Sequence, residues 1–415
     1  MNNDDVYCVE DYYLDESNKK LHLILFNTSA FYRDIARRMQ TDHDDILRRS
    51  ANRYDENYEE AMLAVNVHEL FEEEVLDAHA AHMRLFGSRP VQYVTKAELE
   101  GNVLNARNSG REIHQLTINK SLNDSRFYRS QLNSPSENRF PRNILSGFVA
   151  KYAAIVNVGC GNCCFVFDEN NVLVIDCSNR DKGGGQFQDN VEAAIDWVQS
   201  IQKKRFHIDC FLLTHPHYDH YSAVRDFVEY GFIDKKTLCF INLQYQCSVG
   251  AYTQMLVSLK KLGTYTEDPI AGKVAGPLSI LHPNVSPTRC RKVNNASIIS
   301  EVITEHHNII FPGDIENSIT NEGWNIVPKK AMKTVANSSY YVLSHHGSHN
   351  GYGTKLNNPL FSFCSTRPNV YNGIPDPATL SVFQNLMRTD VIIPSSQKPC
   401  QYIGVDLEGE TATYV

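Results

Sequence analysis

Apolar and polar residues follow two different patterns along the chain, and the change falls near residue 145. Before it, an apolar run at residues 21–26 predicts one short strand. Residues 55–86 carry apolar side chains at the spacing of an amphipathic helix, which Gly87 and Pro90 then end. We therefore expect an N-terminal domain over residues 1–145 that is mostly helical, in the mainly α or α+β class.

The last part of this domain is unusually basic. Residues 105–143 are rich in Asn, Ser and Arg, and their positive charges are Arg107, Arg111, Lys120, Arg126, Arg129, Arg139 and Arg142. Only Glu112, Asp124 and Glu137 oppose them. The composition predicts a solvated basic linker, and a contact surface for an anionic substrate is the alternative interpretation.

After residue 150 the pattern changes to short apolar runs separated by turn residues. These runs predict strands at residues 153–158, 164–167, 172–175, 208–213, 237–243, 297–303, 309–311 and 340–343. Amphipathic stretches at residues 190–201 and 222–230 predict helices between some of them. Strands that alternate with helices indicate a layered α/β domain, which we place at residues 146–415.

Length and charge narrow the functional classes. A chain of 415 residues is long enough for two domains. Its net charge of −8 argues against non-specific nucleic-acid binding over the whole surface, although not against a local basic groove. The acidic N-terminus lacks the pattern of a signal peptide, and no apolar stretch reaches the roughly 18 residues of a membrane span. We expect a cytoplasmic protein without membrane contact.

The cysteines support the same compartment. The chain has 11 of them, without the spacing of a disulfide framework, which indicates reduced thiols. Cys160 and Cys163 have the spacing of a zinc or redox pair, but no second pair lies nearby. We interpret them as buried thiols.

The strongest chemical signal is the segment FLLTHPHYDH at residues 211–220. A buried strand ends there and is followed by His215, His217, Asp219 and His220 within one short loop. A loop at a strand end lets alternate side chains converge on one point. Imidazole and carboxylate ligands without a thiolate suit zinc, manganese or iron. The loop therefore predicts a metal site.

HPHYDH resembles the HxHxDH signature of the metallo-β-lactamase superfamily, and the resemblance extends over about residues 150–405. It implies an αββα sandwich in which His215 and His217 bind one metal ion while Asp219 and His220 bind a second. It implies further that Asp176, at the end of the strand VLVID, braces the metal loop, and that Asp314, in FPGD, bridges both metals. The expected cofactor is Zn²⁺ or Mn²⁺, with one or two ions per chain.

Four later segments narrow the resemblance to the ComEC-like subgroup of competence DNA-uptake proteins: LHP at residues 281–283, NNAS at 294–297, PGDIE at 312–316 and HHGS at 345–348. In that subgroup a histidine of the late loop completes the first metal site. The sequence does not show whether His345 or His346 is that ligand. Asn295 and Ser297 are expected to support the ligands from behind.

One position departs from the subgroup. Where its GHPSPEVL-like segment supplies a histidine to the second metal, this chain has Ile374, which cannot act as a ligand. Water, Asp376 or His349 would have to complete that site. The second site is therefore weak, selective for a metal with water ligands, or empty.

The functional hypothesis is metal-assisted hydrolysis of a phosphodiester, as in a nuclease or cyclic-nucleotide phosphodiesterase, with Asp219, Asp314 and His346 as catalytic candidates. A lactone, thioester or amide hydrolase is the first alternative, and a regulatory metal-binding protein of low activity, suggested by Ile374, is the second. Expected partners are an anionic small molecule or nucleic acid as substrate. The N-terminal domain is a candidate for contact with a partner protein or a second copy.

Overall fold

The computed structural model describes the chain in segments. In the N-terminal part it describes the backbone of residues 6–15, 20–27, 60–66 and 94–95. In the C-terminal part it describes residues 145–159, 161–178, 186–241, 252, 255–256, 259, 262–267, 272, 274–283, 294–317, 323–351, 353–366 and 374–415. The chain divides into two compact units, Met1–Ser134 with Cys247–Gln254, and Pro135–Gln246 with Met255–Val415.

The first unit contains a 4-stranded antiparallel sheet in the order β3-β2-β1-β4. Its strands are β1 (Val6–Asp15), β2 (Lys20–Asn27), β3 (Glu60–Asn66) and β4 (Val94–Thr95). β2 confirms the strand predicted at residues 21–26. The helix predicted over residues 55–86 is wrong where β3 lies. The described residues of this unit are strands, and a mostly helical N-terminal domain stays a prediction.

The physical reason is the length of the apolar run. Residues 61–65 fit a strand as well as one turn of a helix, and the sequence alone does not arbitrate between them. β2 offers backbone hydrogen-bonding groups along the whole of β3, with Leu63 opposite Leu23. The rest of the predicted helix and the basic segment at residues 105–143 lie outside the described residues.

The second unit contains two large sheets. The first is 8-stranded, in the order β10-β9-β8-β7-β6-β5-β20-β21. Its strands are β5 (Tyr152–Val156), β6 (Cys163–Phe167), β7 (Val172–Cys177), β8 (Cys210–Leu212), β9 (Leu238–Phe240), β10 (Tyr265–Glu267), β20 (Tyr402–Asp406) and β21 (Thr411–Tyr414). β7 and β8 are parallel, so their carboxyl ends lie at the same edge of the sheet.

The second sheet is 7-stranded, in the order β11-β12-β13-β14-β15-β16-β17. Its strands are β11 (Val274–Ala275), β12 (Leu278–His282), β13 (Ile299–Ile303), β14 (Asn308–Phe311), β15 (Tyr340–Val342), β16 (Phe361–Cys364) and β17 (Leu386–Arg388). β14, β15 and β16 are parallel, whereas β13 is antiparallel to β14. The ends of β14 and β15 therefore share an edge with the beginning of β13. A separate pair, β18 (Ile392–Ile393) and β19 (Lys398–Pro399), forms a small hairpin.

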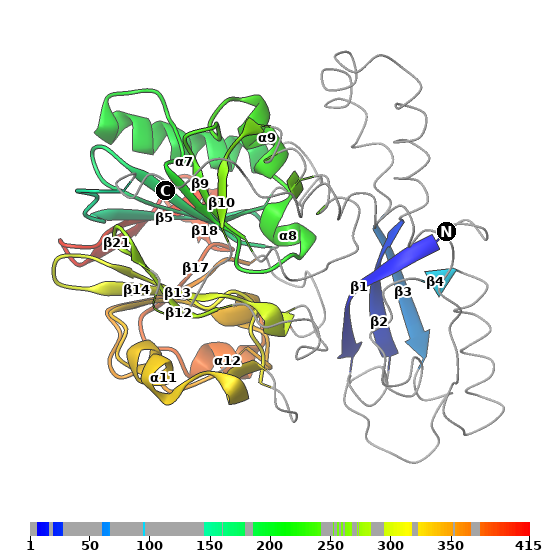
Figure 1. The fold of residues 1–415 in the computed structure, drawn as a ribbon. Helices are drawn as coiled ribbons and strands as arrows, with labels where there is room; N and C mark the ends of the chain where they lie inside the picture. The colour runs from blue at the N-terminus through cyan, green and yellow to red at the C-terminus, as the bar shows by residue number, and fades with distance from the viewer. Residues whose placement is uncertain are drawn as a thin grey trace, which may run out of the picture. The chain divides into compact units, whose positions relative to one another are not determined.

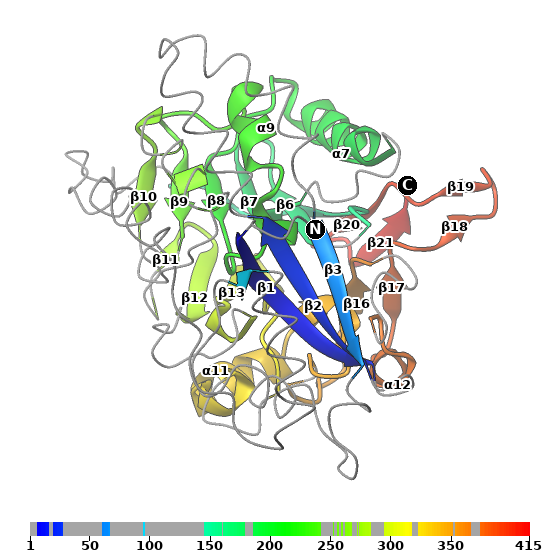
Figure 2. The same ribbon diagram turned by 90° about the vertical axis from the view of Figure 1, so that its right-hand side faces the viewer.

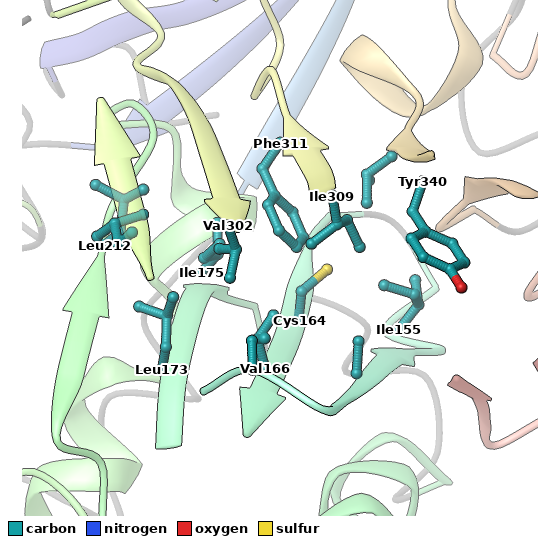
Figure 3. Close-up of a cluster of buried hydrophobic side chains, with 14 of the residues drawn as sticks. Ile155, Cys164, Val166, Leu173, Ile175, Leu212, Val302, Ile309, Phe311 and Tyr340 are labelled. Carbon is teal, nitrogen blue, oxygen red and sulfur yellow. The ribbon is translucent and has the colours of Figure 1, made fainter. Parts of the chain in front are cut away.

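The two sheets pack face to face around one apolar core. Figure 3 shows Ile155, Cys164 and Leu173 of the first sheet opposite Val302 and Phe311 of the second. Every one of these side chains is at most 2% exposed. Burying side chains of this size contributes about 1.5–3 kcal/mol each, so this interface is the main reason why the two sheets hold a fixed spacing.

Helices cover the outer face of each sheet (Figures 1 and 2). α7 (Gln186–Gln202) and α9 (Val224–Glu229) lie on the first sheet, and α11 (Lys329–Ala336) and α12 (Pro377–Ser381) lie on the second. The ring of Trp197 in α7 stands 5.0 Å from Phe167 and 5.4 Å from Tyr402, centroid to centroid. On the other side, Val335 of α11 joins a second buried cluster with Ile310. The layers are those of the expected αββα sandwich.

The eight strands predicted between residues 153 and 343 are confirmed, each with small shifts at its ends, and so are the two helices, as α7 and α9. The sequence did not predict β10, β11, β12 or the strands from β16 to β21, which are two to five residues long. Within the described part of the chain, no helix has both the length and the apolar character that a membrane span requires.

Candidate metal centre

The HPHYDH segment follows β8 at the edge where the two sheets meet. Thr214 accepts a backbone hydrogen bond from the N–H of Ile298, 2.8 Å away, which ties this loop to the beginning of β13. The short helix α8 (Tyr218–Tyr221) then turns Asp219 and His220 back toward His215. His215, His217, Asp219 and His220 are all buried, at 7% exposure or less. The loop therefore buries its polar side chains together, which requires partners for them.

Asp314 is the point on which the imidazoles converge. Its Oδ2 atom lies 3.2 Å from His220 Nε2, 3.3 Å from His346 Nε2 and 3.9 Å from His215 Nε2. The carboxylate is 2% exposed and lies three residues after the end of β14. Side chains from both sheets thus meet at one carboxylate.

Asp219 and His346 form a second group beside the first. Asp219 Oδ2 lies 3.5 Å from His346 Nε2, and Asp219 Oδ1 lies 3.9 Å from His220 Nε2. His215, His220 and Asp314 have ligand atoms within 4.8 Å of one another, as do Asp219, His220 and His346. Because His220 belongs to both groups, they are adjacent and overlap.

His217 lies at the rim of this arrangement. Its Nδ1 atom is 3.1 Å from His215 Nε2, and the two rings meet edge to face with their centroids 4.7 Å apart. It does not belong to either group of three ligand atoms among the described residues. His217 is therefore held next to a candidate ligand through His215.

The late loop distinguishes His346 from its neighbour. His346 Nε2 points at Asp219 and Asp314, whereas His345 Nδ1 lies 3.1 Å from Glu316 Oε1. Both residues have a left-handed backbone, with φ of 48° and 50°. Such a conformation costs about 1–3 kcal/mol for a residue with a side chain and is concentrated at functional sites. Of the two candidates that the sequence left open, the structure directs His346 at the cluster.

Asp176 braces the loop from behind. It is the last residue but one of β7, has a left-handed φ of 55° and is 1% exposed. Its Oδ2 lies 2.7 Å from His220 Nδ1, and its Oδ1 accepts a hydrogen bond from the Thr214 N–H at 2.8 Å. A carboxylate at Nδ1 holds a ring proton there, so Nε2, which faces Asp314, is the ring atom placed to bind a metal ion.

The turn before β13 supports the Asp314 loop. The Asp314 N–H donates to Ser297 Oγ at 3.0 Å, and the Glu316 N–H donates to Asn295 Oδ1 at 3.0 Å. Asn294 Nδ2 donates to the Glu316 carboxylate at 2.7 Å. Asn295 and Ser297 thus hold the backbone on both sides of Ile315, and Glu316 connects this turn to His345.

Charge is strongly coupled within the cluster. Burial acts to raise the pKa of Asp314, but the imidazoles of His220, His346 and His215 outweigh it and hold that pKa well below its usual range. Burial acts to lower the pKa of His346, but Asp314 and Asp219 raise it to about 9. In the same way the nearby carboxylates outweigh burial and hold the pKa of His220 well above its usual range. The Asp314 carboxylate therefore stays ionised and requires positive charge close to it.

These residues fit a divalent metal ion. The Oδ1 atom of Asp314 is buried and has no hydrogen-bond partner within the described part of the chain. A buried carboxylate oxygen without a partner is costly unless a cation takes that place. The donors around it are imidazole nitrogens and carboxylate oxygens without a thiolate, the set that zinc and manganese accept.

The structure also places the residues considered for the second metal. His346 groups with Asp219 and His220, the pair expected at the second metal, although the resemblance assigned the late-loop histidine to the first. Asp376 is the N-cap of α12, where its Oδ2 accepts from the Thr379 N–H at 2.7 Å, and His349 is exposed. Ile374 is buried at 8% exposure. His346 therefore lies beside the two residues expected at the second metal, and the ligands of that metal stay a prediction.

Two residues near the cluster were not singled out from the sequence. Thr214 Oγ1 donates to Asp176 at 2.8 Å and lies 3.1 Å from His215 Nδ1, and its position inside the motif was the available signal. Cys364 Sγ lies 3.2 Å from the backbone oxygen of His346, and burial raises the pKa of this thiol to about 12. No sequence pattern marks it. Cys163, from the CxxC segment, is a buried free thiol as expected, and Cys160 lies outside the described residues.

The comparison with protein families agrees with the architecture. Residues 156–235 match the profile described as "Metallo-beta-lactamase superfamily". This stretch contains β6 to β8 and the whole HPHYDH loop. Together with the αββα layers it confirms the predicted metallo-β-lactamase fold. No curated protein matches the chain.

Solved structures of the same fold resemble the chain remotely. The metallo-β-lactamase fold protein YhfI from Bacillus subtilis is 11% identical, covers 57% of this chain and 96% of its own, and has a TM-score of 0.34. A diphosphatase from the PhnP family is 10% identical, covers 57% and 94%, and has a TM-score of 0.35. AidC, a dizinc quorum-quenching lactonase, is 13% identical, covers 37% and 55%, and has a TM-score of 0.26. Likenesses at this level carry no argument about substrate.

Proposed function

We propose that this chain is a metal-dependent hydrolase that cleaves phosphodiesters. The observation that carries the proposal is the convergence of His215, His220 and His346 on the single buried carboxylate of Asp314, one of whose oxygens has no hydrogen-bond partner among the described residues. Asp219 lies within the same cluster. A polar group of this size, buried without function, would only destabilise the fold.

The residues divide naturally into two overlapping ligand sets. His215, Asp314 and His217 would hold one divalent ion, and Asp219, His220, His346 and Asp314 would hold the other. The second set is complete without a ligand from position 374, so this proposal does not require a degenerate second site. Zn²⁺ or Mn²⁺ suits the donors.

A divalent metal ion held there supplies Lewis acidity, which lowers the pKa of a water molecule to about 7 and offsets negative charge growing on the substrate. The protein's own residues then place the proton. Asp219 is 10% exposed in its side chain, against 2% for Asp314. Asp219 therefore lies nearer the solvent side of the cluster, and we assign to it the orientation and deprotonation of the attacking water. Asp314 and His346 act by holding the cluster together.

Two features favour a phosphodiester over a carboxylic ester or amide. The two proposed ligand sets share Asp314, whose Oδ2 lies close to both His215 and His220, so their centres are close together, the arrangement that suits in-line phosphoryl transfer. The ComEC-like segments, whose Asn295, Ser297, Asp314 and His346 all line this cluster or support it, also favour a phosphate ester. The fold alone does not decide, because it hosts several chemistries.

The experiment is a metal analysis of the purified full chain together with a substrate screen. Single-stranded DNA, double-stranded DNA, RNA, cyclic dinucleotides and bis(p-nitrophenyl) phosphate are tested beside chromogenic lactones, thioesters and amides, with Zn²⁺ or Mn²⁺ added. The proposal expects bound metal and turnover of at least one phosphodiester, both lost in Asp314→Asn. Turnover of a lactone or thioester alone would replace it with the first alternative.

The matched control is Asp168→Asn. Asp168 is also a buried aspartate, but it accepts hydrogen bonds from the backbone N–H groups of Asn170 and Asn171 in a turn between strands. The Asp168→Asn variant should differ from the wild type in the stability of the fold and bind the same amount of metal. Metal bound to the wild type without turnover of any substrate would favour a regulatory protein of low activity.

A further inference from the structure

The loop that presents His346 needs support from outside itself. His345, His346 and Gly347 follow one another with φ values of 48°, 50° and 79°. L-residues with side chains rarely adopt this left-handed region, so two consecutive ones relax unless their surroundings hold them. The position of His346 Nε2 beside Asp219 and Asp314 depends on this backbone.

Cys364 supplies one of the external contacts. It is the last residue of β16, the parallel neighbour of β15, from which the loop emerges. Its thiol donates to the backbone carbonyl of His346 at 3.2 Å, and its side chain is fully buried. The contact therefore acts directly on the peptide that follows His346.

The fit around this thiol is close. A Cβ atom built on Gly347 would stand 3.2 Å from Cys364 Sγ and 3.1 Å from Leu380 Cδ2. On the other side, the Asp376 N–H donates to the Gly347 carbonyl at 2.9 Å. Gly347 is thus enclosed between β16 and the segment that leads into α12. The loop has little freedom to shift as long as these contacts remain.

We propose that Cys364 is a positioning residue for metal binding: its thiol holds the His346 peptide in the left-handed conformation that directs Nε2 at Asp219 and Asp314. The consequence for catalysis rests on the proposed function. The consequence for metal affinity does not, because it follows from the placement of the imidazole alone.

Cys400 provides a matched comparison within the same chain. Its thiol also donates to a backbone carbonyl, that of Tyr402, at 3.2 Å, and its side chain is also fully buried. Tyr402 lies in β20 and is not one of the candidate ligands. Removing the Cys400 sulfur therefore creates the same loss of a weak hydrogen bond and of buried volume, without effect on His346.

The experiment measures Zn²⁺ affinity of the full chain by competition with a chromogenic chelator, and the melting temperature of the metal-free form. Cys364→Ala should weaken Zn²⁺ binding by about 10-fold, the scale of losses behind a ligand. Cys364→Ser keeps a donor and should recover most of that affinity. Cys400→Ala should lower the melting temperature to a comparable degree and leave affinity unchanged.

The proposal is overturned if Cys364→Ala and Cys400→Ala bind Zn²⁺ equally well, or if Cys364→Ser is as weak as Cys364→Ala, since packing alone would then explain the site. Should Cys364→Ala not fold, Cys364→Ser decides alone: affinity near that of the wild type supports the hydrogen bond, and a 10-fold loss contradicts it. Absence of any phosphodiester turnover in the wild type would remove the proposed function and leave this test intact.

Discussion

Replacing Asp176 by Asn should change the tautomer of a ligand. Asp176 Oδ2 lies 2.7 Å from His220 Nδ1, while Oδ1 accepts from the Thr214 N–H at 2.8 Å. An asparagine keeps the shape but has one acceptor oxygen, which the Thr214 N–H retains. Its NH₂ group then faces His220 Nδ1 and forces that atom to accept. The ring proton then moves to Nε2, which lies 3.2 Å from Asp314 Oδ2. A protonated Nε2 can no longer bind a metal ion.

The magnitude follows from the interaction that is lost. A hydrogen bond to a charged group contributes about 1.5–3 kcal/mol, which corresponds to a loss of metal affinity of about 10- to 100-fold. The metal-free fold should change less. Burial raises the pKa of Asp176 even though His220 and Thr214 act in the opposite direction, so the carboxylate is not in a favourable environment for its charge. A neutral amide relieves that burden.

The assay is a Zn²⁺ competition titration of Asp176→Asn beside the melting temperature of the metal-free protein. Asp168→Asn is the control, because its carboxylate is equally buried but accepts from the Val149 and Asn171 N–H groups. The expected result is a large loss of affinity in Asp176→Asn alone. Wild-type affinity in that variant, or an equal loss in both, would refute the reasoning about the tautomer.

Three further changes test other parts of the centre. His217→Ala should lose one of two metal equivalents and nearly all turnover, since water does not replace the imidazole in a shaped site, and full occupancy measured by elemental analysis would contradict this. Ile374→His should lower the stability of the metal-free protein by about 1–3 kcal/mol and add no metal, because the position is buried and His346 already serves the cluster; a melting temperature that rises only with Zn²⁺ would show the opposite. Zn²⁺ affinity should rise with pH up to about 9, because His346, whose pKa is raised to about 9, must release a proton when it binds the metal. Calorimetry in buffers of different ionisation enthalpy measures that proton release. A Zn²⁺ affinity independent of pH from about 6.5 to 8.5 would contradict this prediction.

The amino-acid sequence by itself determined the layers and the metal loop. Apolar runs of suitable length predicted β5 to β9 and β13 to β15, because a buried strand needs a continuous apolar segment and that requirement is local. His215, His217, Asp219 and His220 lie within six residues, so their convergence needs only one turn at a strand end. Local order is what a sequence pattern records best.

Only the tertiary structure decided between His345 and His346, because two adjacent histidines are equivalent in the sequence. In the structure His345 contacts Glu316, whereas His346 contacts Asp314. It also assigned β3 to a strand, since the partner that satisfies its backbone groups lies more than thirty residues earlier, in β2. The support from Cys364 left no trace in the pattern, because one buried sulfur against one carbonyl imposes no periodicity. Contacts between segments far apart in the chain depend on how sheets and loops pack in space. The pattern of residues along the chain does not record which distant segments come together.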